Sequence, residues 1–147
     1  MKIYVASSWK NEYQDIVVNS LRYAGHAVYD FKNPPGDKGG FHWKQVGLLS
    51  ESRNVDDYLR ALEHPRAVEG FRSDIEHLND SDGCCLVMPC GFSAALELGI
   101  AIGQRKKTAV YIPEMRDPDL MILAADLITT KIHGLLEFFD AAKRQPE

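Results

Sequence analysis

A single carboxylate stands in an otherwise apolar stretch of the chain. Glu97 lies within Ala-Ala-Leu-Glu-Leu-Gly-Ile-Ala-Ile-Gly, residues 94–103, which is apolar on nearly every side when drawn as a helix. The residues three and four positions away offer no cation to pair with it. Burying an unpaired carboxylate is costly. Glu97 therefore either has specific partners in a functional site or points to solvent near the helix start, where the helix dipole favours an acid.

Asp74 raises the same question. It lies at the edge of an apolar helical stripe made by Val68, Phe71, Ile75 and Leu78, and charged residues flank it. Asp74 is therefore either a ligand-binding acid or a surface residue of a structural helix.

Several further side chains suit the recognition of a small molecule. Ser7, Ser8 and Lys10 carry hydroxyl and ammonium groups that can hold a phosphate, although a serine at a helix start often serves only as a cap. Trp43 follows a loop rich in Gly and either closes over a ring or packs locally. Cys90 is a possible nucleophile, but no histidine is near it in sequence, and small buried cysteines are common.

The elements that position these residues alternate between strand and helix. Hydrophobic periodicity predicts strands over residues 2–6, 26–31, 84–88, 108–112 and 127–130, and helices over residues 11–24, 55–62, 66–79, 93–104 and 132–143. This alternation is typical of an α/β protein with a doubly wound parallel sheet. Right-handed crossovers favour a flavodoxin-like sheet of five strands in the order 2-1-3-4-5. We expect residues 1–147 to form a single domain, with a mobile loop at residues 33–40.

In such a sheet, ligands bind outside the carboxyl ends of the strands, where the strand order reverses. Here that crevice lies between the first and third strands, and the segments that leave these strands are residues 6–10 and 89–93. Both lead into helix N-termini, which attract anions. Gly91 and a capping Ser93 are therefore candidate binding residues, and Glu97 should face the same crevice.

Composition narrows the class of partner. The net charge of −4 argues against non-specific nucleic-acid binding and favours a small-molecule ligand. Three cysteines within seven residues, in an odd number, predict reduced thiols and a cytoplasmic protein, and their spacing predicts no metal site. No apolar run reaches the ~20 residues of a membrane span. We expect no cofactor.

Four segments in order resemble a known family: residues 2–9 (KIYVASSW), 71–74 (FRSD), 93–99 (SAALELG) and 118–121 (PDLM). They are similar to the nucleoside 2-deoxyribosyltransferases and their nucleoside-monophosphate N-glycosidase relatives. The resemblance implies that Glu97 is the nucleophile, that Tyr4 holds it, and that Asp74 binds substrate. It also implies that Asp119 and Met121 reach into the site of a neighbouring subunit.

The chain departs from the transferase pattern at two places. The loop after the third strand reads Pro-Cys-Gly where the transferases carry an acid, and Asp119 stands where they have asparagine. Ser8 and Lys10, beside Trp9, resemble the serine and arginine that the monophosphate hydrolases use on phosphate. These differences favour hydrolysis of a phosphorylated nucleoside.

The expected reaction is cleavage of an N-glycosidic bond through a ribosyl ester on Glu97, which water or a second base then resolves. Two alternatives stay open: a NAD-cleaving enzyme similar to TIR domains, and a non-catalytic nucleotide-binding or sensing module. We also expect a homo-oligomer, most simply a dimer, because the sheet covers one face of the 94–103 helix and its other apolar faces need a partner.

Overall fold

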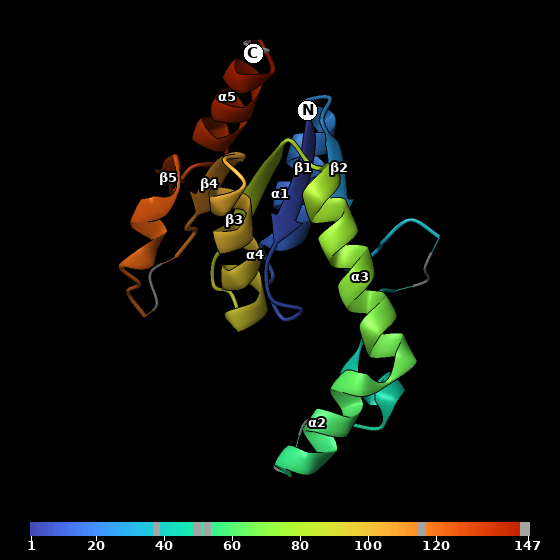
Figure 1. Cartoon of the computed structure of the whole chain (residues 1–147). Coiled ribbons are helices and arrows are strands. Elements are labelled where there is room, and N and C mark those ends of the chain that lie inside the picture. Colours follow the sequence, from blue (N-terminus) through green and yellow to red (C-terminus); the bar gives the residue numbers. More distant parts are fainter. Residues whose placement is uncertain (37–38, 49–50, 52–53, 115–116, 145–147) are drawn as a thin grey trace. The chain divides into compact units, whose positions relative to one another are not determined.

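The structure, a computed structural model, describes residues 1–36, 39–48, 51, 54–114 and 117–144 (Figure 1). Its strands are β1 (Lys2–Ala6), β2 (Ala27–Asp30), β3 (Gly83–Val87), β4 (Lys107–Tyr111) and β5 (Leu127–Thr129). Its α-helices are α1 (Gln14–Tyr23), α2 (Val55–Glu63), α3 (Pro65–Asp80), α4 (Phe92–Gly103) and α5 (Ile132–Lys143). Two 3-10 helices, η1 (Trp43–Val46) and η2 (Met121–Ala124), complete the described elements. The loop expected at residues 33–40 includes residues 37 and 38, which lie outside the described residues.

The five strands form one sheet in the order β2-β1-β3-β4-β5, and every neighbouring pair is parallel. This confirms the expected α/β class and the flavodoxin-like order. In register, Val5 of β1 pairs with Asp30 of β2 and Cys85 of β3. The order reverses between β1 and β3. A ligand crevice at the carboxyl ends of these two strands therefore stays the expectation.

The chain divides into two compact units. The first, Met1–Asp30 with Leu78–Glu147, contains the sheet, and the second is Phe31–His77. In the second unit, the Trp43 ring packs edge-on against Phe41 and Tyr58, at centroid distances of 5.0 and 5.5 Å. The expectation of a single domain over residues 1–147 stays a prediction.

The core of the sheet unit lies between the sheet and two helices. Alternate residues of the central strands face α1 and α5, where Val17, Leu21, Leu135 and Phe139 pack against them. The other face of the sheet carries α4, through its buried Ala94, Leu98 and Ala101. Two-sided burial explains why β3 is apolar along its whole length.

Gly83 opens β3 where the backbone leaves no room for a side chain. A Cβ at this position would lie 2.9 Å from the Lys107 carbonyl oxygen and 2.9 Å from Cε1 of Phe139. The glycine therefore permits close pairing of β3 with β4 beneath α5.

None of the described helices has both the length and the apolar character that crossing a bilayer would require.

Candidate active site at the carboxyl ends of β1 and β3

Glu97 is held by a tyrosine on the central strand. The Tyr4 hydroxyl donates a hydrogen bond of 3.0 Å to Oε1 of Glu97. The Tyr4 side chain is fully buried, and its ring stacks on Tyr29 at a centroid distance of 5.1 Å. Two strands and one helix thus set the orientation of the carboxylate.

The position of Glu97 on α4 follows from the burial pattern of that helix. Glu97 precedes buried Leu98 and lies three and four residues from buried Ala94 and Ala101, so it borders the face that packs on the sheet. Because α4 begins at Phe92, Glu97 belongs to the second turn, beyond the reach of the helix dipole. Glu97 is therefore not the first-turn acid of the structural interpretation; it is half-buried and hydrogen-bonded to Tyr4.

The β3–α4 loop ends differently from the sequence prediction. Gly91 is the N-cap of α4, with φ of −95° and ψ of 179°, and its backbone carbonyl accepts a hydrogen bond of 3.3 Å from the Ala95 N–H. Ser93 was expected to cap this helix, but the helix begins one residue before it. Ser93 instead lies exposed within the first turn. Both residues still belong to the segment that faces the crevice.

The β1–α1 loop also differs from its prediction. Helix α1 begins at Gln14 rather than at residue 11, and Tyr13 is its N-cap. Oδ1 of Asn11, two residues before the N-cap, accepts the N–H groups of Tyr13 (2.7 Å) and Gln14 (2.9 Å). The serines before it therefore do not cap the helix. The Ser7 hydroxyl donates to the Ser8 carbonyl at 3.3 Å, and that carbonyl accepts the Asn11 N–H at 3.0 Å.

These contacts leave the candidate phosphate ligands in a tight turn. Ser7 is buried, Ser8 is half-buried, and Trp9 and Lys10 are exposed at the turn. The hydroxyl and ammonium groups are therefore carried by a loop next to the β3–α4 segment, to which Asn11 ties it. Their role toward a phosphate stays a prediction.

Asn11 is the site residue that the sequence analysis missed. Its Nδ2 group donates to the carbonyl oxygens of Val87 (3.0 Å) and Pro89 (2.9 Å), which belong to the end of β3 and the loop after it. The available signal was an asparagine shortly before the first buried helical residue, where its side chain can accept the N–H groups of a helix start. The helix predicted over residues 11–24 includes Asn11, which in the structure precedes α1.

The three cysteines are unpaired thiols, and none is poised as a thiolate. Burial raises the pKa of Cys84 well above its usual range, with smaller contributions from Cys85 and Glu97, and burial likewise raises the pKa of Cys85. Cys90 is half-buried, and burial, then the charges of Asp119 and Glu97, raise its pKa. Because the thiolate is the nucleophile, Cys90 is a poor candidate for covalent chemistry.

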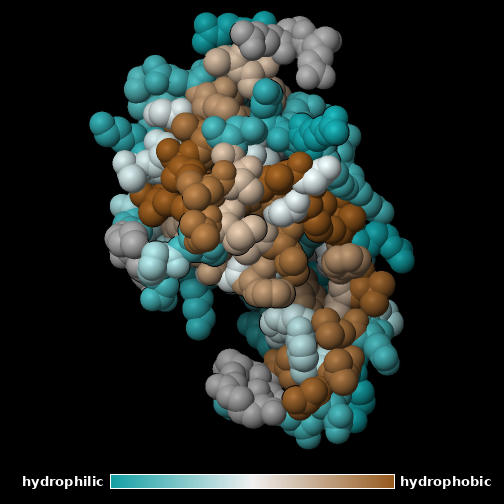
Figure 2. Space-filling model, turned by 60° about the vertical axis from the view of Figure 1, so that its left-hand side comes forward, coloured by the Kyte–Doolittle hydropathy of each residue, from teal (hydrophilic) through white to brown (hydrophobic). Residues whose placement is uncertain are grey.

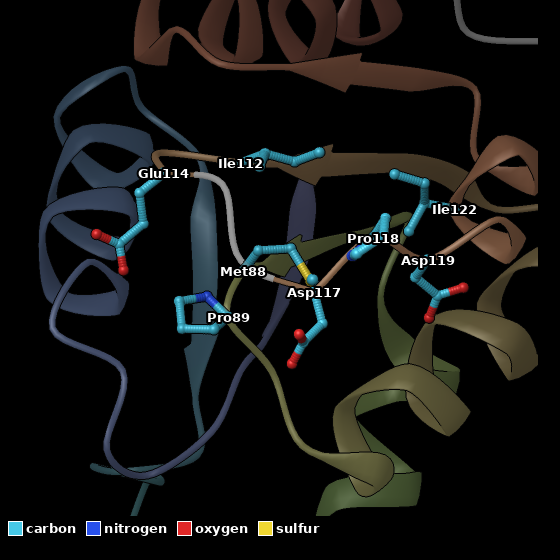
Figure 3. Close-up of a pocket in the computed structure, with 8 residues that line it drawn as sticks. All are labelled: Met88, Pro89, Ile112, Glu114, Asp117, Pro118, Asp119 and Ile122. Atoms are coloured by element: carbon cyan, nitrogen blue, oxygen red, sulfur yellow. The ribbon is translucent and has the colours of Figure 1, made fainter.

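A small pocket opens beside Cys90 at the ends of β3 and β4 (Figure 3). Its volume is about 140 Å³. Apolar side chains and three carboxylates line it: Met88, Pro89, Ile112, Pro118, Ile122, Glu114, Asp117 and Asp119. Asp119 also accepts the Met121 N–H at 2.8 Å, which starts η2, and Glu114 accepts the Tyr13 hydroxyl at 3.1 Å. The pocket thus offers an apolar interior with acceptors around it.

Two expected site residues lie in the other unit. Asp74 is on α3 and Trp43 is in η1, both within Phe31–His77. The roles that the resemblance implies for them stay predictions. Among the described residues, no group of three or more His, Cys, Asp or Glu side chains is arranged to hold a metal ion.

Comparison with known proteins finds matches at the level of structure. A 2-deoxyribosyltransferase from Bacillus psychrosaccharolyticus aligns with a TM-score of 0.56 and 21% identity, over 92% of this chain and 90% of that one. A conserved protein from Enterococcus faecalis aligns with a TM-score of 0.60 and 14% identity, over 97% and 98%. The CMP N-glycosidase BcmB of Clostridium botulinum aligns with a TM-score of 0.52 and 13% identity, over 95% and 99%. No family model and no curated protein sequence matches the chain.

These matches establish a shared fold. The 2-deoxyribosyltransferases and the monophosphate N-glycosidases, the two groups that the sequence resembles, both occur among the matching structures. The resemblance found in the four sequence segments is therefore confirmed at the level of the fold.

Proposed function

We propose that this protein breaks the N-glycosidic bond of a nucleoside or a nucleoside 5′-monophosphate, through a ribosyl ester on Glu97. The observation that carries the proposal is the 3.0 Å hydrogen bond from the buried Tyr4 to the Glu97 carboxylate. Tyr4 belongs to β1, which with β3 borders the point where the strand order reverses, and α/β sheets bind their ligands at such a point. The fold shared with a 2-deoxyribosyltransferase and a CMP N-glycosidase supports the same class of reaction.

The reaction takes place in two steps. In the first, a carboxylate oxygen of Glu97 forms a bond to the anomeric carbon while the bond from that carbon to the base nitrogen breaks. The electron pair leaves on the base, which takes up a proton. In the second step, water attacks the same carbon and restores the carboxylate, or a second base does so and a new nucleoside forms. Tyr4 keeps the carboxylate in one orientation through both steps.

The pocket beside Cys90 is our candidate site for the base. A cavity of about 150 Å³ accommodates one six-membered aromatic ring, and this pocket has a volume of about 140 Å³. Its carboxylates accept hydrogen bonds but donate none when ionised. A base that presents an amino group, such as cytosine, therefore suits it better than uracil. Asp119 lines this pocket, and the charges of Asp119 and Glu97 both raise the pKa of Cys90, the residue after Pro89.

We further propose that the working unit is a homo-oligomer. The outward face of α4 exposes Phe92 (83%) and Leu96 (54%), and the segment around η2 exposes Leu120 (76%) and Met121 (74%). Figure 2 shows hydrophobic surface gathered on the side of the molecule that carries β5 in Figure 1. A second copy of the chain would cover this surface, and two-fold pairing is the commonest arrangement.

The unpaired thiols fit a reducing compartment such as the cytoplasm.

One experiment tests the reaction directly. The protein is incubated with nucleosides, their 5′-monophosphates and NAD, and free base is measured by chromatography. We expect base release from a monophosphate, with CMP consumed faster than UMP, and no release by Glu97→Ala, which should still fold. Release from NAD alone would instead favour the TIR-like reaction. Undiminished release by Glu97→Ala would exclude the proposed nucleophile.

A further inference from the structure

One side chain connects the two loops that border the crevice. Asn11 follows β1, is 4% exposed, and uses its amide in both directions. Its oxygen accepts two N–H groups at the start of α1, and its nitrogen donates to the carbonyl oxygens of Val87 and Pro89 after β3. These four hydrogen bonds span the point where the strand order reverses.

The contacts of Asn11 with the start of α1 are only half of this arrangement. The N–H groups at a helix start need acceptors, and the Oδ1 atom of Asn11 supplies one. The two donated hydrogen bonds lie outside α1 and join the loop that leads into α4. Pro89 is two residues before Gly91, the N-cap of α4, so the position of this carbonyl bears on the start of the helix that carries Glu97.

Two further side chains at the start of α1 form hydrogen bonds with residues at the ends of other strands. Nε2 of Gln14 donates to Asp30 at the end of β2 (2.7 Å), and the Tyr13 hydroxyl donates to Glu114 after β4 (3.1 Å). The β1–α1 loop is therefore anchored at the carboxyl ends of three other strands. Asn11 makes the contact that lies nearest to Glu97 along the chain.

We propose that Asn11 is a positioning residue, which holds the loop of Ser8 and Lys10 at a set distance from the start of α4 and thereby aligns a bound substrate with Glu97. The inference rests on the proposed function for its catalytic consequence. Its structural content, the tie between the two loops, does not depend on that function.

The test uses a variant that separates the two uses of the amide. Asn11→Asp keeps the acceptor for the N–H groups at the start of α1 but replaces the donor with a second acceptor, which repels the carbonyl oxygens of Val87 and Pro89. The matched control is Thr108→Val. Thr108 is also buried, and it lies at the start of β4, at the end of the sheet opposite Asn11. Its hydroxyl donates a hydrogen bond of 3.1 Å to the Asp126 carboxylate and accepts one of 3.2 Å from the Asp126 N–H.

Two measurements are made on both variants. Hydrogen exchange of the backbone amides at residues 90–98 reports on the loop and the start of α4. Steady-state kinetics on the substrate of the wild type report on alignment. For Asn11→Asp we expect faster exchange in this segment and a kcat about 10- to 100-fold lower, with KM changed much less, because misplacement by about 1 Å can reduce a rate 100-fold. For Thr108→Val we expect a loss of stability with both readouts near those of the wild type.

Each result decides a separate point. Exchange at residues 90–98 that is the same in Asn11→Asp as in Thr108→Val would overturn the tie between the loops. Faster exchange with an unchanged kcat would overturn the role in alignment. A wild type that cleaves no N-glycosidic bond would contradict the proposed function, and the exchange measurement would then decide the positioning role alone.

Discussion

Tyr4 and Glu97 are 93 positions apart in the chain, yet the hydroxyl of one lies 3.0 Å from the carboxylate of the other. The contact is possible because β1 and β3 are neighbours in the sheet and α4 returns across the face that Tyr4 points to. The pair thus depends on the strand order itself.

Removal of the Tyr4 hydroxyl should lower activity while the protein still folds. Tyr4→Phe keeps the ring that stacks on Tyr29 but deletes the hydrogen bond to Glu97. We expect kcat to fall about 10-fold or more, since one hydrogen bond to a charged group contributes about 1.5–3 kcal/mol. Steady-state kinetics and urea unfolding measure the two effects. Tyr111→Phe, a buried tyrosine on the other face of the sheet, is the control and should keep its activity.

Lys10 tests phosphate recognition. Its side chain is exposed in the β1–α1 loop, where the ammonium group can pair with a phosphate. Lys10→Ala should raise KM for a nucleoside monophosphate about 10-fold and leave use of the unphosphorylated nucleoside nearly unchanged. Lys107 begins β4, at the end of the sheet opposite the β1–α1 loop. Lys107→Ala should therefore alter the KM of neither substrate. Equal losses on both substrates would contradict the assignment.

Met121 tests the proposed oligomer. An arginine in place of this exposed methionine introduces a charge into the apolar surface that we assign to a second copy of the chain. We expect Met121→Arg to lower the mass measured by light scattering and to lower activity with it. Tyr23→Arg changes an even more exposed residue at the end of α1 and should do neither. An active wild-type monomer at low micromolar concentration would exclude the oligomer.

His26 should make stability depend on pH. Its side chain is buried beside Phe139, with Nε2 3.2 Å from Oδ1 of Asp140. Burial lowers the pKa of His26 below the ordinary value of 6.5. The N-terminal amine and Lys143 lower this pKa further, whereas Asp140 opposes them. The unfolded state therefore binds the proton more readily, and the free energy of unfolding should fall as pH drops below about 6.5.

Urea unfolding between pH 8 and pH 5 measures this dependence. His26→Gln should flatten the curve across this range. His133→Gln replaces a histidine whose side chain is 82% exposed, and it should leave the curve unchanged. A wild-type curve that is flat through the same range would contradict the assignment.

Arg105 offers a route to higher stability. It follows α4 with a φ of 57°, in the left-handed region that favours glycine, and its N–H and that of Lys106 close the helix end on Ile102 and Ala101. Gly25 occupies the equivalent place after α1, with a φ of 82°. Arg105→Gly should raise the free energy of unfolding by about 0.5–1 kcal/mol, and Gly25→Ala should lower it by about 1 kcal/mol. Both changes are measurable by urea unfolding.

The fold was predictable because each buried strand is a short apolar run between turn residues. The strand over residues 2–6 was predicted with the bounds it has, and the strand order followed from alternation and handedness. Helix starts were predicted less well. The start of α1 depends on the hydrogen bonds that the Asn11 side chain accepts, and the start of α4 on the backbone of Gly91; no local pattern of apolar residues encodes either.

The candidate site was predictable in part. Glu97 was conspicuous because it is one charge in an apolar helix. Its orientation became visible only with the fold, because Tyr4 looks like any other apolar strand residue until its hydroxyl finds an acceptor. The bridging role of Asn11 was hidden for the same reason, since its partners Val87 and Pro89 are 76 and 78 positions away.

Tyr4 belongs to β1, which pairs with β2 on one side and β3 on the other. Residues of central strands are released only when the whole domain opens, whereas loops open locally at a much smaller free energy. The group that orients Glu97 therefore remains in place as long as the protein is folded. A destabilising substitution far from the crevice should reduce the number of competent molecules and leave each remaining molecule as active as before.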